Sequence, residues 1–172
     1  MDFNRLNTGE KIAGIAGVIL LISMWLFSWF EITGVNGVDV PSGVGDAAAN
    51  AWESFSLIDI IIFLTAVAAI GAALLAASEG DAGLPVAMSA VVTALGALTV
   101  LLILFRLIDP PNLEVNGVGA PSGVDVDIGR KIGVFIGLLS AAAVTYGGYM
   151  GMQEEGTSFQ GERDRLRSPE TR

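Results

Sequence analysis

Long apolar runs separated by short polar segments are the main pattern along the chain. Residues 12–30 carry no charge and correspond to about 28 Å of helix, close to the roughly 30 Å hydrocarbon core of a bilayer. Further apolar runs of spanning length occupy residues 57–77, 84–108 and 129–152. The pattern predicts an all-α membrane protein, an antiparallel bundle of four transmembrane helices within residues 1–152, followed by a disordered tail at residues 153–172.

The two outer loops, residues 31–56 and 109–128, contain an internal repeat. Residues 35–44 read VNGVDVPSGV and residues 115–124 read VNGVGAPSGV, so eight of ten positions match at an offset of 80. Each copy lies between two apolar runs. We therefore expect two tandem helix–loop–helix repeats.

The repeated loop also predicts local β structure. Asn36 and Gly37 lie between valines, and both residue types tolerate the positive φ of a type I′ hairpin turn. Alternating valines on either side favour short strands. We expect the two outer loops to pair or pack against each other as a small β-rich cap.

Aromatic residues mark one end of the first two spans. Trp25 and Trp29 are four residues apart and are expected on one helix face as an aromatic belt at the membrane surface. Asp46 is a candidate cap for a short helix over residues 47–55. That helix would turn Trp52 toward the membrane and lie in the interface.

The distribution of basic residues predicts the orientation in the membrane. The segments before the first span and after the fourth hold most of the lysines and arginines, whereas the interiors of the repeated loops hold none. Both termini are therefore expected in the cytoplasm, in a multi-pass plasma-membrane protein. Arg106, Arg130 and Lys131 lie at the outer helix ends, where neighbouring aspartates offset them.

Small residues recur every four positions at the start of the fourth span, at Gly129, Gly133, Gly137 and Ala141. This glycine-zipper spacing lets helix backbones approach closely inside a membrane. Two interpretations remain open from the sequence. The ladder either packs within the four-helix bundle or forms the interface of a homo-oligomer.

Asp59 and Arg106 are the charged residues inside the second and third apolar runs. An ionisable residue within a span is a functional candidate, since an aspartate facing a cavity can carry protons or sodium. Both residues, however, lie near the outer ends of their helices. We expect them to form an intramembrane ion pair, with a transport path lined by Asp59 as the alternative.

The amino-acid composition argues against several classes of function. The chain is 52% hydrophobic, contains neither cysteine nor histidine, and has a net charge of -9. The missing residues remove the commonest metal ligands and general base, and the negative charge argues against nucleic-acid binding. The acidic outer loops are read as a solvated surface rather than a calcium site. We therefore expect no cofactor and no enzymatic activity.

Two segments carry a resemblance to known proteins. GEKIAGIAGVILLISMWLFSWF and NAWESFSLIDIIIF resemble parts of small four-span inner-membrane proteins of bacteria that have no established activity. The layout is also similar to claudin-like proteins, whose larger first outer loop holds a tryptophan, as Trp52 does here, although their cysteines are missing. The resemblance implies four spans and no specific chemistry.

The sequence thus predicts a non-enzymatic membrane protein with a structural, accessory or scaffold role. It would act through helix packing or through the outer cap, in contact with the lipid bilayer and with a second copy or another membrane protein. The alternative is a small cation- or proton-coupled transporter or channel that uses Asp59.

Overall fold

A computed structural model describes residues 6–39, 48–54, 57–78, 87–110 and 125–154. Its main elements are four long helices, all apolar and long enough to cross a bilayer. They are α1 (Thr8–Leu26), α3 (Leu57–Ser78), α4 (Ala87–Ile108) and α5 (Ile132–Glu154). Many of their large aliphatic side chains are exposed, as lipid-facing residues are. The chain is an integral membrane protein with a four-helix bundle.

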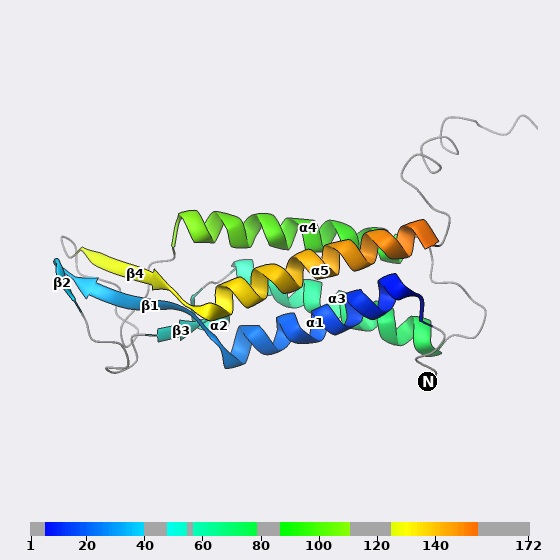
Figure 1. The fold of residues 1–172 in the computed structure, drawn as a ribbon, viewed down its shortest axis with the longest axis horizontal. Coiled ribbons are helices and arrows are strands. Elements are labelled where there is room, and N and C mark those ends of the chain that lie inside the picture. Colours follow the sequence, from blue (N-terminus) through cyan, green and yellow to red (C-terminus); the bar gives the residue numbers. More distant parts are fainter. Residues whose placement is uncertain (1–5, 40–47, 55–56, 79–86, 111–124, 155–172) are drawn as a thin grey trace, which may run out of the picture.

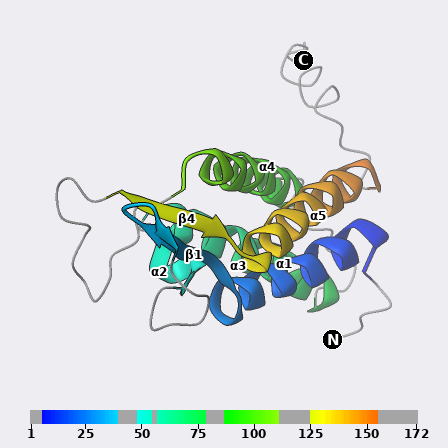
Figure 2. The same ribbon diagram turned by 60° about the vertical axis from the view of Figure 1, so that its left-hand side comes forward.

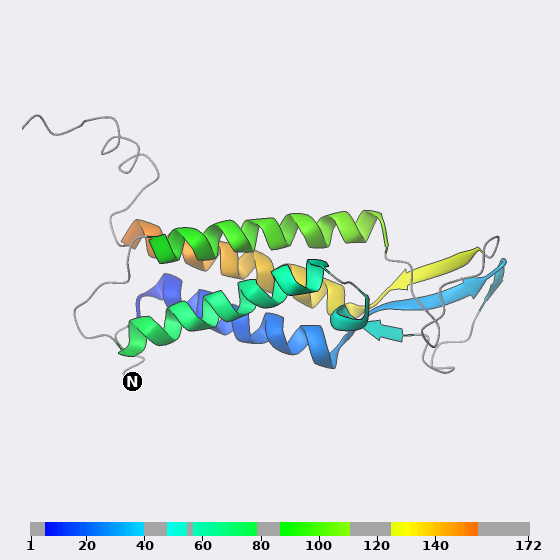
Figure 3. The same ribbon diagram turned by 180° about the vertical axis from the view of Figure 1, so that it is seen from behind.

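The helices form an antiparallel ring. Helix α1 packs on α3 and α5, and α4 packs on the same two helices from the opposite side of the bundle (Figures 1 and 3). Helices α1 and α4 run toward one end, and α3 and α5 run back. The start of α1 and the end of α5 consequently lie at the same end of the bundle.

A small antiparallel sheet extends from the other end, here called the sheet end (Figure 1). Its central strand is β1 (Ser28–Val35), which follows α1 directly and pairs with three partners. These are β2 (Val38–Asp39), β3 (Ala48–Asn50) and β4 (Val126–Arg130). Strand β4 runs along one edge of β1, from Phe30 opposite Arg130 to Val35 opposite Val126, so β2 and β3 share the other edge.

This sheet, called the cap below, bears out the expected hairpin and the pairing of the two outer loops. Asn36 and Gly37 have φ values of 51° and 76°, the positive values that a type I′ turn requires. The hairpin tip is also bonded to the second loop, because the Asn36 amide donates to the Asp125 carbonyl at 2.8 Å. The second copy of the repeat, at residues 115–124, lies outside the described residues, and the tandem repeat stays a prediction.

Two of the expected span boundaries were wrong by several residues. The first span was expected at residues 12–30, but α1 begins at Thr8 behind an Asn7 capping box and ends at Leu26. The fourth was expected from Gly129, but α5 begins at Ile132. In both cases the apolar residues at the sheet end belong to a strand, since the pairing of β1 with β4 satisfies their backbone groups instead of a helix.

The other expected elements agree more closely. Helix α3 spans the second predicted run, and α4 ends at Ile108 as predicted, while residues 79–86 lie outside the described structure. The interfacial helix expected over residues 47–55 is only the short α2 (Ala51–Ser54), because β3 takes up the residues before it. Helix α5 extends two residues into the expected tail, and the structure describes nothing beyond Glu154.

The bundle has two kinds of core. Near the sheet end it is built from large side chains, among them Leu20, Met24, Trp29, Phe30 and Ile62. Toward the opposite end it consists mainly of alanines, with Val92 and Val144. Small residues allow the helices to approach closely there. The large side chains belong to the end of the bundle from which β1 and β4 extend, and Figure 2 shows this junction of cap and bundle.

Candidate functional site

The junction between the cap and the bundle is organised around Trp29. This side chain is 0% exposed, and its indole Nε1 donates a hydrogen bond to the Ser23 carbonyl in the last turns of α1 at 2.9 Å. The indole ring lies against Gly133 and Gly137 of α5, where added Cβ atoms would collide with it. Trp29 therefore links β1 to two helices at once.

The expected belt of Trp25 and Trp29 on one helix face is therefore wrong, because α1 ends before Trp29. Trp25 is exposed, and its ring centroid lies 6.1 Å from that of Trp52, which in turn lies 6.0 Å from Phe63. These three rings, from α1, α2 and α3, form an aromatic group at the sheet end, in which Trp25 and Trp52 are exposed and Phe63 is partly buried. The helical spacing of the two tryptophans was misleading because it crosses the end of a helix.

The expected glycine ladder is split between the cap and the bundle. Gly129 lies in β4, where an added Cβ would meet the Thr33 side chain at 2.6 Å. Gly133 and Gly137 receive Trp29, and Ala141 is buried in the same core cluster. Closer to the C-terminus of α5, Gly147 lies against the backbone of α1 at Gly9. Within the described residues these positions are occupied by contacts inside one chain.

Two basic residues between the cap and α5, Arg130 at the end of β4 and Lys131 after it, connect the cap to the helix ends. Lys131 forms an ion pair with Glu31 of β1, whose side chain is nearly buried, and the Lys131 amide donates to the Trp29 carbonyl at 2.8 Å. Arg130 donates through Nε and Nη2 to the Leu107 carbonyl at 2.9 and 2.6 Å, which caps the C-terminus of α4. Sequence reasoning placed both residues at the outer helix ends but missed these contacts.

A polar contact joins α3 and α4 inside the apolar part of the bundle. The hydroxyls of Thr65 and Thr99 are 2.7 Å apart, and both residues are buried. A hydrogen bond between helices in a membrane contributes on average about 0.6 kcal/mol. The contact also fixes the register of the two antiparallel helices.

This register bears on the expected Asp59–Arg106 pair. Asp59 is six residues before Thr65 and Arg106 is seven residues after Thr99, which is about 9 Å and 10.5 Å along the respective helices. Both residues consequently lie at the same level, near the sheet end. Asp59 is 3% exposed, in the first turn of α3, and Arg106 is half-buried in the last turn of α4. The ion pair between them stays a prediction.

The acidic residues of the outer loops are not gathered into a metal site in the part of the chain that the structure describes. Glu31 is paired with Lys131, whereas Asp39, Asp125 and Asp127 are exposed along the cap. Asp109, directly after α4, is exposed as well, and the other acidic loop residues lie outside the described structure or have undescribed side chains. The arrangement offers an acidic surface on a firmly attached sheet.

Comparisons with protein-family models, with curated proteins and with solved structures gave no match.

Proposed function

We propose that this protein is a non-enzymatic membrane scaffold. It presents the cap to a partner on the side of the membrane that faces away from the cytoplasm. The observation that carries the proposal is the insertion of Trp29 between the cap and α5. A sheet held by a buried tryptophan, an ion pair and a capped helix end keeps a fixed orientation relative to the bundle. A fixed orientation is what a docking platform needs.

The surface of the cap supports this role. Val38 at the hairpin is 69% exposed, and Asp39, Asp125 and Asp127 lie exposed near it. An exposed apolar residue on a sheet that also carries exposed carboxylates suits a protein partner with a basic rim. The glycines of the ladder, for which bundle packing and an oligomer interface were both open, contact residues of the same chain, which favours association through the cap over association through the ladder.

We also propose that both termini lie in the cytoplasm and that the membrane is the inner membrane of a bacterium. Positive charges at the sheet end count against this orientation when they are read from the sequence alone. Arg130 and Lys131 are bound to a helix carbonyl and to Glu31, so these charges are compensated within the fold. The layout remains similar to that of claudin-like proteins in architecture only.

Photo-crosslinking tests the scaffold role. The photoreactive amino acid benzoylphenylalanine is placed at Val38 in the cap or at Leu101, a 64% exposed lipid-facing residue of α4. We expect a protein adduct from Val38 in intact cells and none from Leu101. Adding Trp29→Ala should remove the Val38 adduct, because the cap then loses its fixed orientation.

Each other outcome has a definite meaning. An adduct from Leu101 alone assigns association to the helices and contradicts docking through the cap. No adduct from either position contradicts the scaffold role itself. An adduct of twice the chain mass would identify the partner as a second copy.

One observation favours the second candidate, a small cation- or proton-coupled transporter or channel. Asp59 is almost completely buried at the end of a transmembrane helix. Proton and sodium flux in liposomes separates the two candidates. The scaffold predicts the same flux as in protein-free liposomes, whereas a transporter predicts a flux that Asp59→Asn abolishes.

A further inference from the structure

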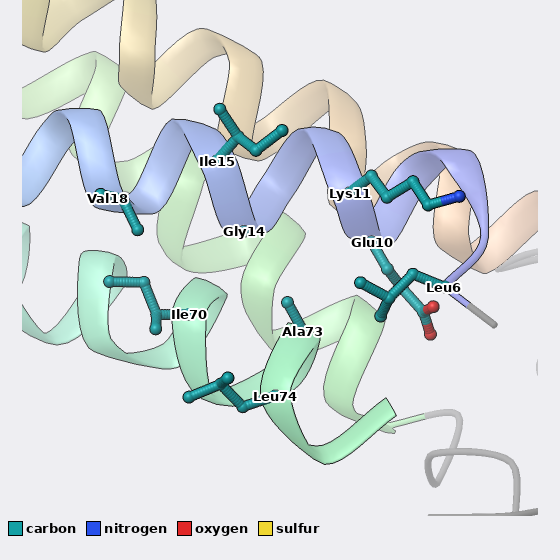
Figure 4. Close-up of a pocket in the computed structure, with 9 residues that line it drawn as sticks. All are labelled: Leu6, Glu10, Lys11, Gly14, Ile15, Val18, Ile70, Ala73 and Leu74. Atoms are coloured by element: carbon teal, nitrogen blue, oxygen red, sulfur yellow. The ribbon is translucent and has the colours of Figure 1, made fainter. Parts of the chain in front are cut away.

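A groove opens between α1 and α3 near the end of the bundle opposite the cap (Figure 4). Its volume is about 460 Å³. The aliphatic part is lined by Gly14, Ile15 and Val18 of α1 and by Ile70, Ala73 and Leu74 of α3. The lining residues lie on two transmembrane helices, so the groove faces the hydrocarbon region of the bilayer.

Small residues form the floor of this groove. A Cβ added to Gly14 would lie 2.7 Å from the Ala73 Cβ, so the two helices touch at this point. The larger side chains beside them stand out as walls, and Ile15 is 64% exposed. The result is an apolar groove along the contact between α1 and α3.

Two charged residues line the polar end of the groove, Glu10 and Lys11 (Figure 4). Glu10 belongs to the Asn7 capping box, in which its carboxylate accepts from the Asn7 amide at 2.9 Å. Lys11 is exposed. Of the basic residues in the described part of the chain, Lys11 lies at the end of the bundle opposite the cap. The others, Arg106, Arg130 and Lys131, lie at the sheet end.

We propose that this groove binds a phospholipid with an anionic headgroup, in the leaflet opposite the cap. The Lys11 ammonium binds the headgroup phosphate, and one acyl chain lies over Gly14 and Ala73. From Glu10 to Val18 the groove follows α1 for about 12 Å, close to the roughly 15 Å that is half the hydrocarbon thickness. The groove therefore matches one acyl chain in length. Lys11 supplies a positive charge for the headgroup phosphate, while the Asn7 amide holds the Glu10 carboxylate at the start of the helix.

The proposal is independent of the scaffold role, because it uses the other end of the bundle. In the capping box the Asn7 amide donates to the Glu10 carboxylate, and the Glu10 amide donates to the Asn7 side chain. These bonds hold the Glu10 side chain at the start of α1. A basic residue near an anionic membrane surface contributes roughly 1 kcal/mol, which corresponds to about a five-fold change in affinity. Headgroup preference is thus measurable with a single substitution.

Native mass spectrometry of the detergent-solubilised full chain tests the site, with titrated phosphatidylglycerol and phosphatidylcholine as probes. We expect the first phosphatidylglycerol to bind the wild type more tightly than phosphatidylcholine. Lys11→Gln should weaken phosphatidylglycerol binding about five-fold and leave phosphatidylcholine unchanged, and Lys11→Arg should keep the preference. Ala73→Leu should weaken both lipids, because its side chain fills the floor of the groove.

Leu101→Phe, on the lipid-facing side of α4, is the matched control and should change neither affinity. Glycerol phosphate should not displace the lipid, since the acyl chain supplies much of the contact. Equal binding of the two lipids, or an unchanged preference in Lys11→Gln, would overturn the headgroup assignment. Ala73→Leu that elutes and melts like the wild type but binds lipid normally would overturn the groove.

Discussion

Replacing Gly137 by alanine is expected to destabilise the protein by about 1–3 kcal/mol, the usual cost of overpacking a filled core. The new methyl group would collide with the six-membered ring of the Trp29 indole. The ring cannot move aside freely, because its Nε1 is bonded to the Ser23 carbonyl and the side chain is fully buried. Reversible unfolding in mixed detergent micelles, followed by far-UV circular dichroism, measures the loss.

A double-mutant cycle assigns this loss to the Trp29 contact. Trp29→Phe removes the part of the ring that meets Gly137, so Gly137→Ala should cost less in that background by about 1 kcal/mol. Gly71→Ala is the matched control, because nothing lies within 4 Å of the position of its added Cβ. It should be neutral or slightly stabilising in a helix. Equal costs of Gly137→Ala in both backgrounds would show that the indole does not occupy this space.

The expected Asp59–Arg106 ion pair predicts that replacing Asp59 by leucine costs about 3 kcal/mol or more, because breaking such a pair would leave the half-buried Arg106 without its counter-ion. The double variant Asp59→Leu with Arg106→Leu should recover most of that loss. The same unfolding measurement applies. This prediction follows from the helix register that the Thr65–Thr99 contact fixes.

Asp39→Leu serves as the control for the loss of a carboxylate, since Asp39 is exposed in the cap and its replacement should change stability by no more than about 0.5 kcal/mol. Additive losses from Asp59 and Arg106 would contradict the ion pair. That result would strengthen the transport alternative, in which Asp59 interacts with a transported cation instead of with Arg106.

Much of the fold follows from patterns that act locally. Length and hydropathy were sufficient to predict four spanning helices, and the Asn36-Gly37 dipeptide was sufficient to predict the hairpin, because its two positive φ values are a property of those residues. Pairing of the two outer loops was also predicted. The residues of the second loop that pair with β1 follow its repeated segment rather than belong to it.

The boundaries at the sheet end could not be predicted, because they depend on tertiary contacts. Trp29 and Phe30 are apolar and continue the helical spacing of α1, yet pairing with β3 and β4 draws them into a strand. For the same reason the ladder from Gly129 to Ala141 looks like one helix face although its first member is in β4. The Arg130 and Lys131 contacts join segments far apart in the sequence and leave no local signal.

Hydrogen–deuterium exchange of the protein in lipid nanodiscs tests most directly whether the cap is held rigidly on the bundle. We predict that the amides of β1 that pair with β4 are protected as long as those in the middle of α1, and that Gly137→Ala shortens the protection in β1 more than in the middle of α1. Exchange of β1 as fast as that of unstructured peptides in the wild type would contradict the account.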